Sequence, residues 1–296
     1  MRSDWTGIRN PVLDRRPGIY ARDPALVLAD GVLRCYHTAV EEREGAYRLF
    51  VDVAESEDLA HWGAVRRLTH SPLNYSSPGN ALWVKGRWEL CLQSYPMAAG
   101  ELYGNETSRL WLMASDDLET WGEPRLIAPQ GCTARWSRSH RQIDPYLVRH
   151  DGRYWCFYKT AGRLGLLVSD DLHAWEEASP DRPVLGPEDT PDGATVENPC
   201  VVRSGDDFVL FFAPCRPGRG IGVARSADLI HWREVRYLED FPRLPWAPNG
   251  PTAAMVLDAR EELGHWLMAF HGETDRAHGA ALGLAWSDDL VIWHAP

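Results

Sequence analysis

The chain has 296 residues, of which 44% are hydrophobic and 25% charged, and its formal net charge at pH 7 is −11. This is the composition of an ordinary globular protein with enough length for a large core. The acidic balance argues against nucleic acid or an anionic membrane as the main partner, because both repel a negative surface. No apolar stretch reaches the length of a membrane span, and the first residues lack the apolar segment of a secretory signal, so we expect a cytoplasmic protein.

One short phrase, Ser-x-Asp-Leu-x-x-Trp, recurs five times along the chain. The copies end at Trp62, Trp121, Trp175, Trp232 and Trp293, which are 59, 54, 57 and 61 positions apart. Each copy follows a short alternating or β-branched run, so the phrase is expected on strand-to-strand connections. Its Ser and Asp side chains are suited to bond nearby backbone N–H groups and close a single turn, while Leu and Trp pack inward.

Five units of 54 to 61 residues, made of short strands without helical periodicity, predict an all-β fold, a five-bladed β-propeller with four antiparallel strands per blade. Residues 1–296 are expected to form this one domain. The fifth blade lacks an outer strand, because the sequence stops at Pro296 soon after its last Trp. Residues 8–13, which follow an echo of the repeat at Ser3-Asp4-Trp5, are predicted to supply that strand and close the ring.

The six cysteines are predicted to be free thiols. Cys35, Cys91 and Cys156 recur at nearly the same place in the first three repeats, inside apolar strands, which is typical of buried thiols. The sequence has no Cys-x-x-Cys or His-x-x-x-His pair, no Gly-rich phosphate loop and no Gly-x-Ser-x-Gly elbow. A structural zinc site is therefore not expected.

Three carboxylates, those of Asp23, Asp144 and Glu197, stand where innermost strands are predicted to start. Aligned there, the five units read Arg22-Asp23-Pro24, Gly79-Asn80-Ala81, Ile143-Asp144-Pro145, Glu197-Asn198-Pro199 and Asn249-Gly250-Pro251. Each acid on its own is explained as a turn residue before proline. Together, three acids that converge on the axis would repel one another, which costs stability and separates the pKa values of an acid and a base. We therefore predict a catalytic site.

These residues resemble the glycoside hydrolases of family 43, five-bladed enzymes in which an Asp-Pro on blade one carries the general base. In that family an Asp-Pro on blade three carries the Asp that tunes the acid, and a Glu-Gly-Pro on blade four carries the general acid. The resemblance covers the whole chain and implies that Asp23 is the base, Asp144 the tuning residue and Glu197 the acid. Asp144 would then stay ionised and raise the pKa of Glu197. Asn198 replaces the usual Gly, and blade two begins Pro78-Gly79-Asn80 instead of Trp-Ala-Pro.

The resemblance implies an inverting glycosidase that cleaves pentose-type glycosides, arabinofuranosides or xylosides, from imported oligosaccharides. It also implies that no cofactor is required. His271 in Phe270-His271-Gly272 looks like a blade-five histidine near the axis, where some members hold a calcium ion. No side chain is assigned as a metal ligand, and the sequence leaves the oligomeric state open.

Further candidates for sugar binding lie on the loops that enter the innermost strands. Trp136 and Trp246 stand in polar loops and offer faces for sugar CH groups, whereas the repeat tryptophans are expected to be structural. The polar candidates are Arg22, Asn80, Arg138, Arg141, Asn249 and His271. Solvated loop residues, or for His271 a satisfied core histidine, are equally good explanations.

Three other functions stay open. A fructan-cleaving, retaining glycosidase would carry Asn-Asp-Pro on blade one, whereas Arg22 precedes Asp23 here. A phosphorylase would need a basic phosphate pocket, for which Arg138 and Arg141 are candidates. A non-catalytic sugar-binding propeller would keep the fold without the reaction. Among the enzymes, an inverting pair of carboxyls stands about 6.5–9.5 Å apart and a retaining pair about 5–5.5 Å.

Overall fold

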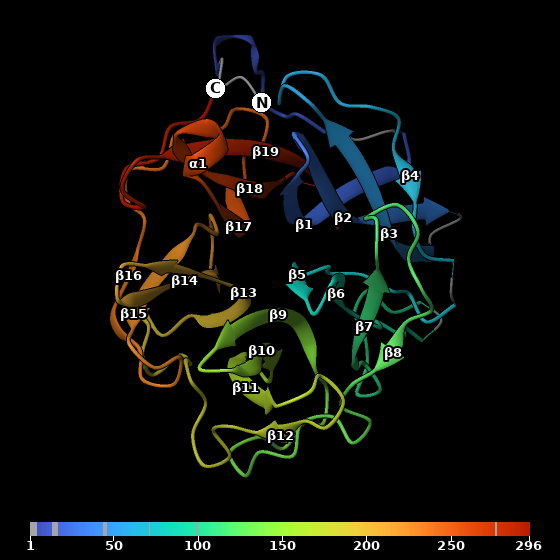
Figure 1. Cartoon of the computed structure of the whole chain (residues 1–296), viewed down its shortest axis with the longest axis vertical. Helices are drawn as coiled ribbons and strands as arrows, with labels where there is room; N and C mark the ends of the chain where they lie inside the picture. Colours follow the sequence, from blue (N-terminus) through green and yellow to red (C-terminus); the bar gives the residue numbers. More distant parts are fainter. Residues whose placement is uncertain (1–4, 14–16, 44–45, 71, 99, 276) are drawn as a thin grey trace.

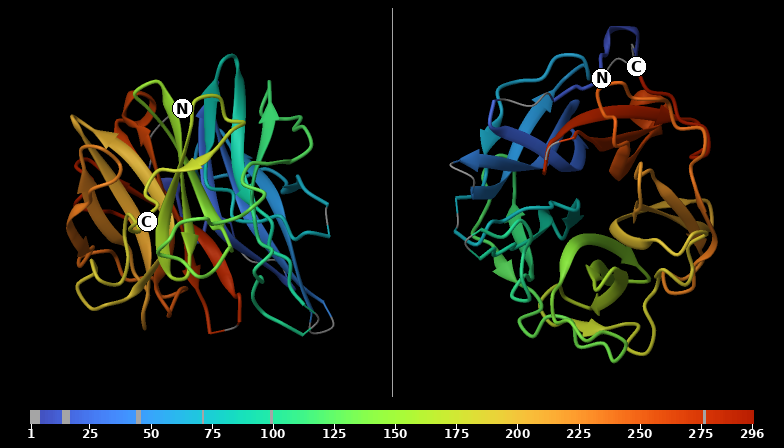
Figure 2. Two further views of the ribbon diagram at one scale, coloured as in Figure 1. Left: turned by 90° about the horizontal axis from the view of Figure 1, so that it is seen from below. Right: turned by 180° about the vertical axis from the view of Figure 1, so that it is seen from behind.

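The computed structural model describes residues 5–13, 17–43, 46–70, 72–98, 100–275 and 277–296. Five antiparallel sheets stand around one central axis, each with its first strand innermost (Figure 1). Seen from behind, the same five sheets surround the axis (Figure 2). The predicted all-β, five-bladed propeller is therefore confirmed. In each sheet, strands that follow one another in the sequence are antiparallel neighbours.

The blades are consecutive along the chain. Blade one contains β1 (Ile19–Ala29), β2 (Val32–Arg43), β3 (Ala46–Ser56) and β4 (Arg66–Arg67), and blade two contains β5 (Ala81–Val84), β6 (Arg87–Gln93), β7 (Leu110–Ser115) and β8 (Arg125–Leu126). Blade three contains β9 (Ile143–His150), β10 (Arg153–Thr160), β11 (Arg163–Ser169) and β12 (Glu176–Glu177), and blade four contains β13 (Thr195–Ser204), β14 (Asp207–Cys215), β15 (Gly222–Ser226) and β16 (Arg233–Tyr237). Blade five contains β17 (Pro251–Ala259), β18 (His265–Glu273) and β19 (Ala280–Ser287), with the single turn α1 (Arg260–Leu263) between the first two.

The N-terminal segment completes blade five, as predicted. Leu13 forms an antiparallel bridge with Leu282 of β19, and its N–H and C=O both bond that residue. The Asn10 side chain donates to the Leu284 carbonyl and accepts from the Leu284 N–H, each at 2.8 Å. Trp5, in the short 3₁₀ turn η1 (Trp5–Gly7), stacks on Trp286 with ring centroids 4.2 Å apart. The outer edge of β19 is thus covered, although the pairing is one bridge rather than a full fourth strand.

The repeated phrase forms the same turn in every blade. In its first copy the Ser56 hydroxyl accepts the Leu59 N–H at 2.9 Å, and the Asp58 carboxylate accepts the His61 N–H at 2.8 Å. The indole of Trp62 then donates to the Leu59 carbonyl at 3.1 Å. The five leucines are at most 3% exposed and adopt positive φ values between 64° and 69°. The phrase therefore fixes the connection to the outer strand and anchors it in the core.

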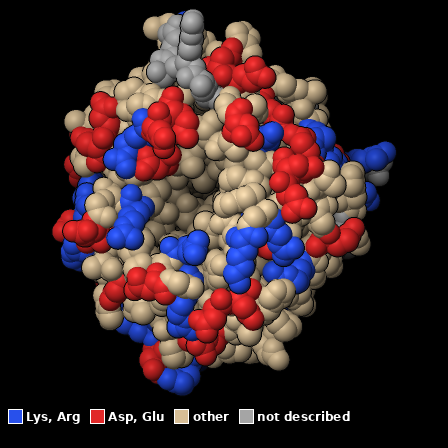
Figure 3. Space-filling view, in the orientation of Figure 1, with Lys and Arg blue, Asp and Glu red and all other residues tan. Residues whose placement is uncertain are grey.

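The buried cysteines and the charged surface are those expected from the composition of a globular protein. All six cysteines are free thiols, as predicted, and five of them are buried. In the part of the chain that the structure describes, no helix is long and apolar enough to cross a membrane. On the face seen in Figure 3, acidic and basic side chains are interspersed around a central hollow.

Candidate active site

In each blade one residue with a positive φ lies in the innermost strand or shortly before it, close to the axis. These residues are Asp23, Ser77, Asp144, Asn198 and Ala253, with φ values of 46°, 42°, 53°, 50° and 48°. The strand pairing shifts register at this point in blades one, three, four and five, which marks a β-bulge. Asp and Asn tolerate this left-handed backbone better than most residues. The five residues line a small cavity of about 30 Å³, together with neighbours that follow them in the chain.

The positive-φ position of each blade is called the kink below. Its place in the chain corrects the predicted alignment of two blades. In blade two the equivalent residue is Ser77, not Asn80, because Pro78 follows the kink while the strand ladder begins only at Ala81. In blade five it is Ala253, not Gly250, because Ala253 has the positive φ and lies at the register shift between Thr252 and Met255. Glu197 also differs from the aspartates, since it precedes the kink residue Asn198 and is the equivalent of Arg22.

The three predicted acids line one cavity of about 180 Å³ at this end of the axis. Asp23 comes from β1, Asp144 from β9 and Glu197 from β13, so three different blades contribute. Four cationic side chains line the same cavity, namely those of Arg22, Arg141, Lys159 and Arg219. The cavity is therefore a mixed-charge site rather than a purely acidic one.

Asp23 is held by hydroxyl groups from two blades. Its Oδ2 accepts hydrogen bonds from Thr38 Oγ1 at 2.9 Å and from Ser77 Oγ at 3.1 Å. Its backbone N–H donates to His271 Nδ1 at 3.0 Å, which fixes the kink from blade five. The side chain is 16% exposed, so the carboxylate is oriented by the protein and still reaches the cavity.

Glu197 is bound by two cations. Lys159 Nζ on β10 donates to Oε2, and Arg219 Nη1 donates to Oε1 at 2.9 Å. Burial opposes ionisation of Glu197, but Lys159 and Arg219 outweigh it and lower the pKa of this carboxyl to about 2. Burial would likewise lower the pKa of Lys159, yet Glu197 and Asp144 raise it, so the ammonium stays charged. Glu197 is an ionised, doubly paired carboxylate in this geometry.

Asp144 has the opposite environment. Its carboxylate is buried and accepts only a long hydrogen bond, from the Asn198 N–H at 3.5 Å, among the described contacts. Burial, with the negative charges of Glu197 and Asp23, raises the pKa of Asp144 to about 7 against the opposing charge of Lys159. The sequence led us to expect an ionised Asp144 and a protonated Glu197. The structure reverses this expectation, because Lys159 and Arg219 lie on Glu197.

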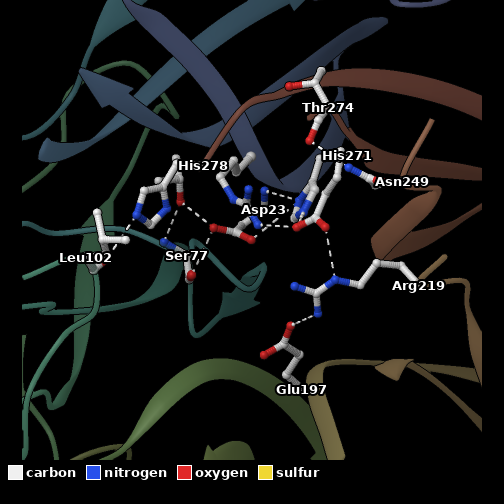
Figure 4. A network of polar contacts seen from close by, with 12 residues as sticks. Asp23, Ser77, Leu102, Glu197, Arg219, Asn249, His271, Thr274 and His278 are labelled. Atoms are coloured by element: carbon white, nitrogen blue, oxygen red, sulfur yellow. Dashed lines mark hydrogen bonds and ion pairs between the residues drawn. The ribbon is translucent and has the colours of Figure 1, made fainter. Parts of the chain in front are cut away.

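A further ionic network links the site to blade five. Glu273 pairs with Arg22 at 2.8 Å and with Arg219 at 3.0 Å. Arg219 also pairs with Glu197, as Figure 4 shows, and thereby bridges the two carboxylates. His271 is 1% exposed, and burial together with the nearby Arg22 lowers its pKa, so the ring is neutral and its Nδ1 accepts the Asp23 N–H. His271 is thus a positioning residue for the Asp23 kink.

The donors around His271 do not fit a calcium ion. Calcium prefers six to eight oxygen ligands. His271 offers a single nitrogen, its Nε2, and the Glu273 carboxylate that lies 3.8 Å from this nitrogen already binds two arginines. Within the described ranges no group of three or more His, Cys, Asp or Glu side chains is arranged to hold a metal ion. We assign no step of a reaction to a metal.

Of the predicted sugar-binding residues, Arg22 and Arg141 line the cavity and the others do not. Asn80 is 7% exposed and uses its amide to bond both the N–H and the C=O of Leu147, which ties blade two to blade three. Trp136 donates to the Ser179 carbonyl. Trp246 stacks on Phe270. In this geometry the three side chains make contacts within the protein and none lines the cavity that holds the acids, so their role in sugar binding stays a prediction.

The two remaining predicted residues lie on the surface. Arg138 is exposed, and Asn249 is exposed and donates to the Thr274 carbonyl at 3.0 Å. Neither lines the cavity that holds the acids.

Sequence reasoning missed several residues of the site. Thr38 and Ser77 hold Asp23, Gln93 fixes the Asp144 N–H at 2.6 Å, and Lys159 and Arg219 bind Glu197. One signal was visible: Lys159 is a lone cation at the end of an otherwise apolar and aromatic run. A charged side chain in such a strand is expected to have an oppositely charged partner, because burying an unpaired ion costs free energy.

The reversed pKa values predict how stability depends on pH. The pKa of Asp144 is raised on folding, so its contribution is fully present below the unfolded value near 3.8 and is lost as pH rises through about 7. Asp144→Asn should therefore match the wild type near pH 4 and become more stable than it by about 2–4 kcal/mol at pH 8. Urea denaturation across this range measures the difference.

Asp206→Asn, in the exposed turn between β13 and β14, is the matched control and should show no such trend. A difference between Asp144→Asn and the wild type that stays constant from pH 4 to pH 8 would contradict the assigned proton.

Comparisons with known proteins bear on the fold. No family model and no curated protein matches this sequence. Solved structures do match. An exo-1,5-α-L-arabinanase from a bovine ruminal metagenomic library is 15% identical, with a TM-score of 0.68 over 94% of this chain and 96% of that one. The family 43 endo-arabinanase of Bacillus licheniformis is 17% identical, with a TM-score of 0.67 over 93% and 97%.

This chain has the fold of the propeller glycoside hydrolases. A family 32 β-fructofuranosidase of Bombyx mori also matches, with 12% identity and a TM-score of 0.68 over 95% of this chain and 64% of that one. The expected likeness to family 43 is thus found in the architecture of the whole chain. A family 43 enzyme and a family 32 enzyme thus both share the fold of this chain.

Proposed function

We propose that this protein is an inverting glycoside hydrolase that acts on pentose-type glycosides, arabinofuranosides or xylosides, in oligosaccharides. The observation that carries the proposal is the convergence of Asp23, Asp144 and Glu197 on one cavity at the axis. Glycoside hydrolysis needs one carboxylate that activates water and one carboxylic acid that protonates the leaving oxygen. The cavity offers groups in both states, because burial keeps a proton on Asp144 while Glu197 stays ionised.

In the proposed reaction Asp23 accepts a proton from water, and the water oxygen bonds the anomeric carbon. The bond from that carbon to the glycosidic oxygen breaks, and the oxygen takes a proton from the Asp144–Glu197 pair. Asp144 is the member of the pair that holds this proton near neutral pH. Thr38 and Ser77 keep the Asp23 carboxylate in place for the attack.

A screen of aryl glycosides, with proton NMR of the first sugar released, tests the proposal. We expect cleavage of an α-L-arabinofuranoside or a β-D-xyloside and an inverted anomer as the first product. A retained anomer would favour a covalent mechanism like that of fructan-cleaving enzymes. Cleavage that requires inorganic phosphate would identify a phosphorylase.

A non-catalytic sugar-binding propeller is the second candidate, and the observation that favours it is the double ion pair of Glu197. A carboxylate held by Lys159 and Arg219 is poorly placed to give up a proton. Binding of oligosaccharides by calorimetry without any release of sugar from the whole panel would select this candidate over the hydrolase.

A further inference from the structure

Three of the four cations in the cavity are paired with acids, and Arg141 is not. Arg22 pairs with Glu273, while Lys159 and Arg219 pair with Glu197. The guanidinium of Arg141 lies over the ring of Tyr95, 5.1 Å from its centroid. Within the described ranges no carboxylate comes within the 4.0 Å of an ion pair with it.

The polar atoms of Arg141 are poorly satisfied by the protein. Its Nε is buried and has no hydrogen-bond partner among the described residues. A guanidinium presents five N–H donors in a rigid fork, and a buried donor without an acceptor costs free energy. The side chain also lines the cavity, so its guanidinium is in position to meet a ligand bound there.

The charge balance indicates the kind of ligand. With Glu273 included, the four cations of the cavity face four carboxylates, those of Asp23, Asp144, Glu197 and Glu273. Acid catalysis requires that one of these carboxyls be protonated. The working site then has one more positive charge than negative charges, and Arg141 is the cation without a partner.

We propose that Arg141 binds an anionic group of the substrate, the carboxylate of a uronic acid or a phosphate. This inference rests on the proposed glycosidase site and extends its substrates from neutral pentosides to those that carry an anionic group, such as a xyloside with a carboxylate on C5. Both anions match the planar fork of a guanidinium and form paired, charge-assisted hydrogen bonds with it. The ring of Tyr95, which lines the same cavity, is a cation–π partner that helps to orient the guanidinium.

Matched substrates test the carboxylate. A β-D-xyloside and a β-D-glucuronide with the same nitrophenyl leaving group differ only by the carboxylate on C5. We expect the wild type to cleave the glucuronide with a kcat/KM at least 10-fold above that for the xyloside. Arg141→Gln should lower kcat/KM for the glucuronide by about 10- to 100-fold and change that for the xyloside much less. Arg141→Lys should recover part of the loss, because it restores the charge without the fork.

Arg203→Gln is the matched control. Arg203 also lies over an aromatic ring, that of Phe208 at 5.8 Å, but it is exposed and outside the cavity. It should leave both rates unchanged. The inference is overturned if the wild type prefers the xyloside, or if Arg141→Gln lowers both rates equally.

Binding separates this inference from the proposed function. If no glycoside is cleaved, calorimetry with D-glucuronate, D-galacturonate, inorganic phosphate and D-xylose tests whether Arg141 binds an anion. Binding of an acid that Arg141→Gln abolishes supports the anion site while the hydrolase proposal fails. Binding of phosphate but of neither uronate assigns the site to phosphate. The proposed anion site is refuted if the wild type binds no anion, or if Arg141→Gln binds the anions as tightly as the wild type does.

Discussion

Asp23→Asn is expected to lower kcat by about 10²–10⁴-fold on whichever glycoside the wild type cleaves. The amide cannot accept a proton from water. Its oxygen can still accept the hydrogen bonds of Thr38 and Ser77, so the side chain should keep its place and KM should change little. Steady-state kinetics of the purified variant, with its melting temperature, measure both effects.

Asp30→Asn is the control for this change. Asp30 stands in the exposed turn at the end of the same strand, also with a positive φ, of 53°, and asparagine fits that backbone. It should retain wild-type kcat. If Asp23→Asn keeps more than a tenth of the wild-type kcat, Asp23 is not the base.

Gly79→Ala is expected to destabilise the propeller by about 3 kcal/mol or more, at the upper end of what overpacking costs. A Cβ on Gly79 would lie 1.6 Å from the Pro145 carbonyl oxygen and 2.8 Å from Cys91 Sγ. The first of these is backbone of the neighbouring blade beside Asp144, so relief would require moving two inner strands apart. Denaturant unfolding measures the loss, and low yield of folded protein would accompany it.

Gly63→Ala separates this clash from the general effect of replacing a glycine. The nearest atom to a Cβ on Gly63 is the Glu55 carbonyl oxygen at 3.6 Å, an ordinary contact. Its stability should stay within about 0.5 kcal/mol of the wild type. A Gly79→Ala protein as stable as Gly63→Ala would show that the blades meet less tightly at the axis.

The fold could be predicted because the repeat carries its own geometry. Each Ser-x-Asp-Leu-x-x-Trp closes the same turn through local hydrogen bonds, as Ser56 and Asp58 do. The outer strands were harder to predict: β4, β8 and β12 have two residues each, whereas β16, which follows the same phrase, has five. The phrase therefore predicts where an outer strand begins but not how long it is.

The site was only partly predictable. Asp23, Asp144 and Glu197 were recognisable because proline follows closely in each case, and they do meet in one cavity. Asn80 looked equivalent to them by its place before a strand, but its amide bonds Leu147 in the next blade. Lys159 lies on β10, the second strand of its blade, and no other residue of the site is next to it in the sequence. The cations that decide which acid holds the proton come together only in three dimensions.

Ring closure has a consequence for the order of folding. Asn10 and Leu284 bond each other across a sequence separation of 274 residues. During synthesis the segment around Asn10 leaves the ribosome long before β19 exists, because chains grow at about 5–20 residues per second. Blades one to four have their strands complete by then, whereas the edge of β19 stays exposed until the oldest part of the chain returns to it. Contacts of such long range form slowly, so we expect closure to be the last event of folding and the nascent, open ring to be the species most prone to aggregate.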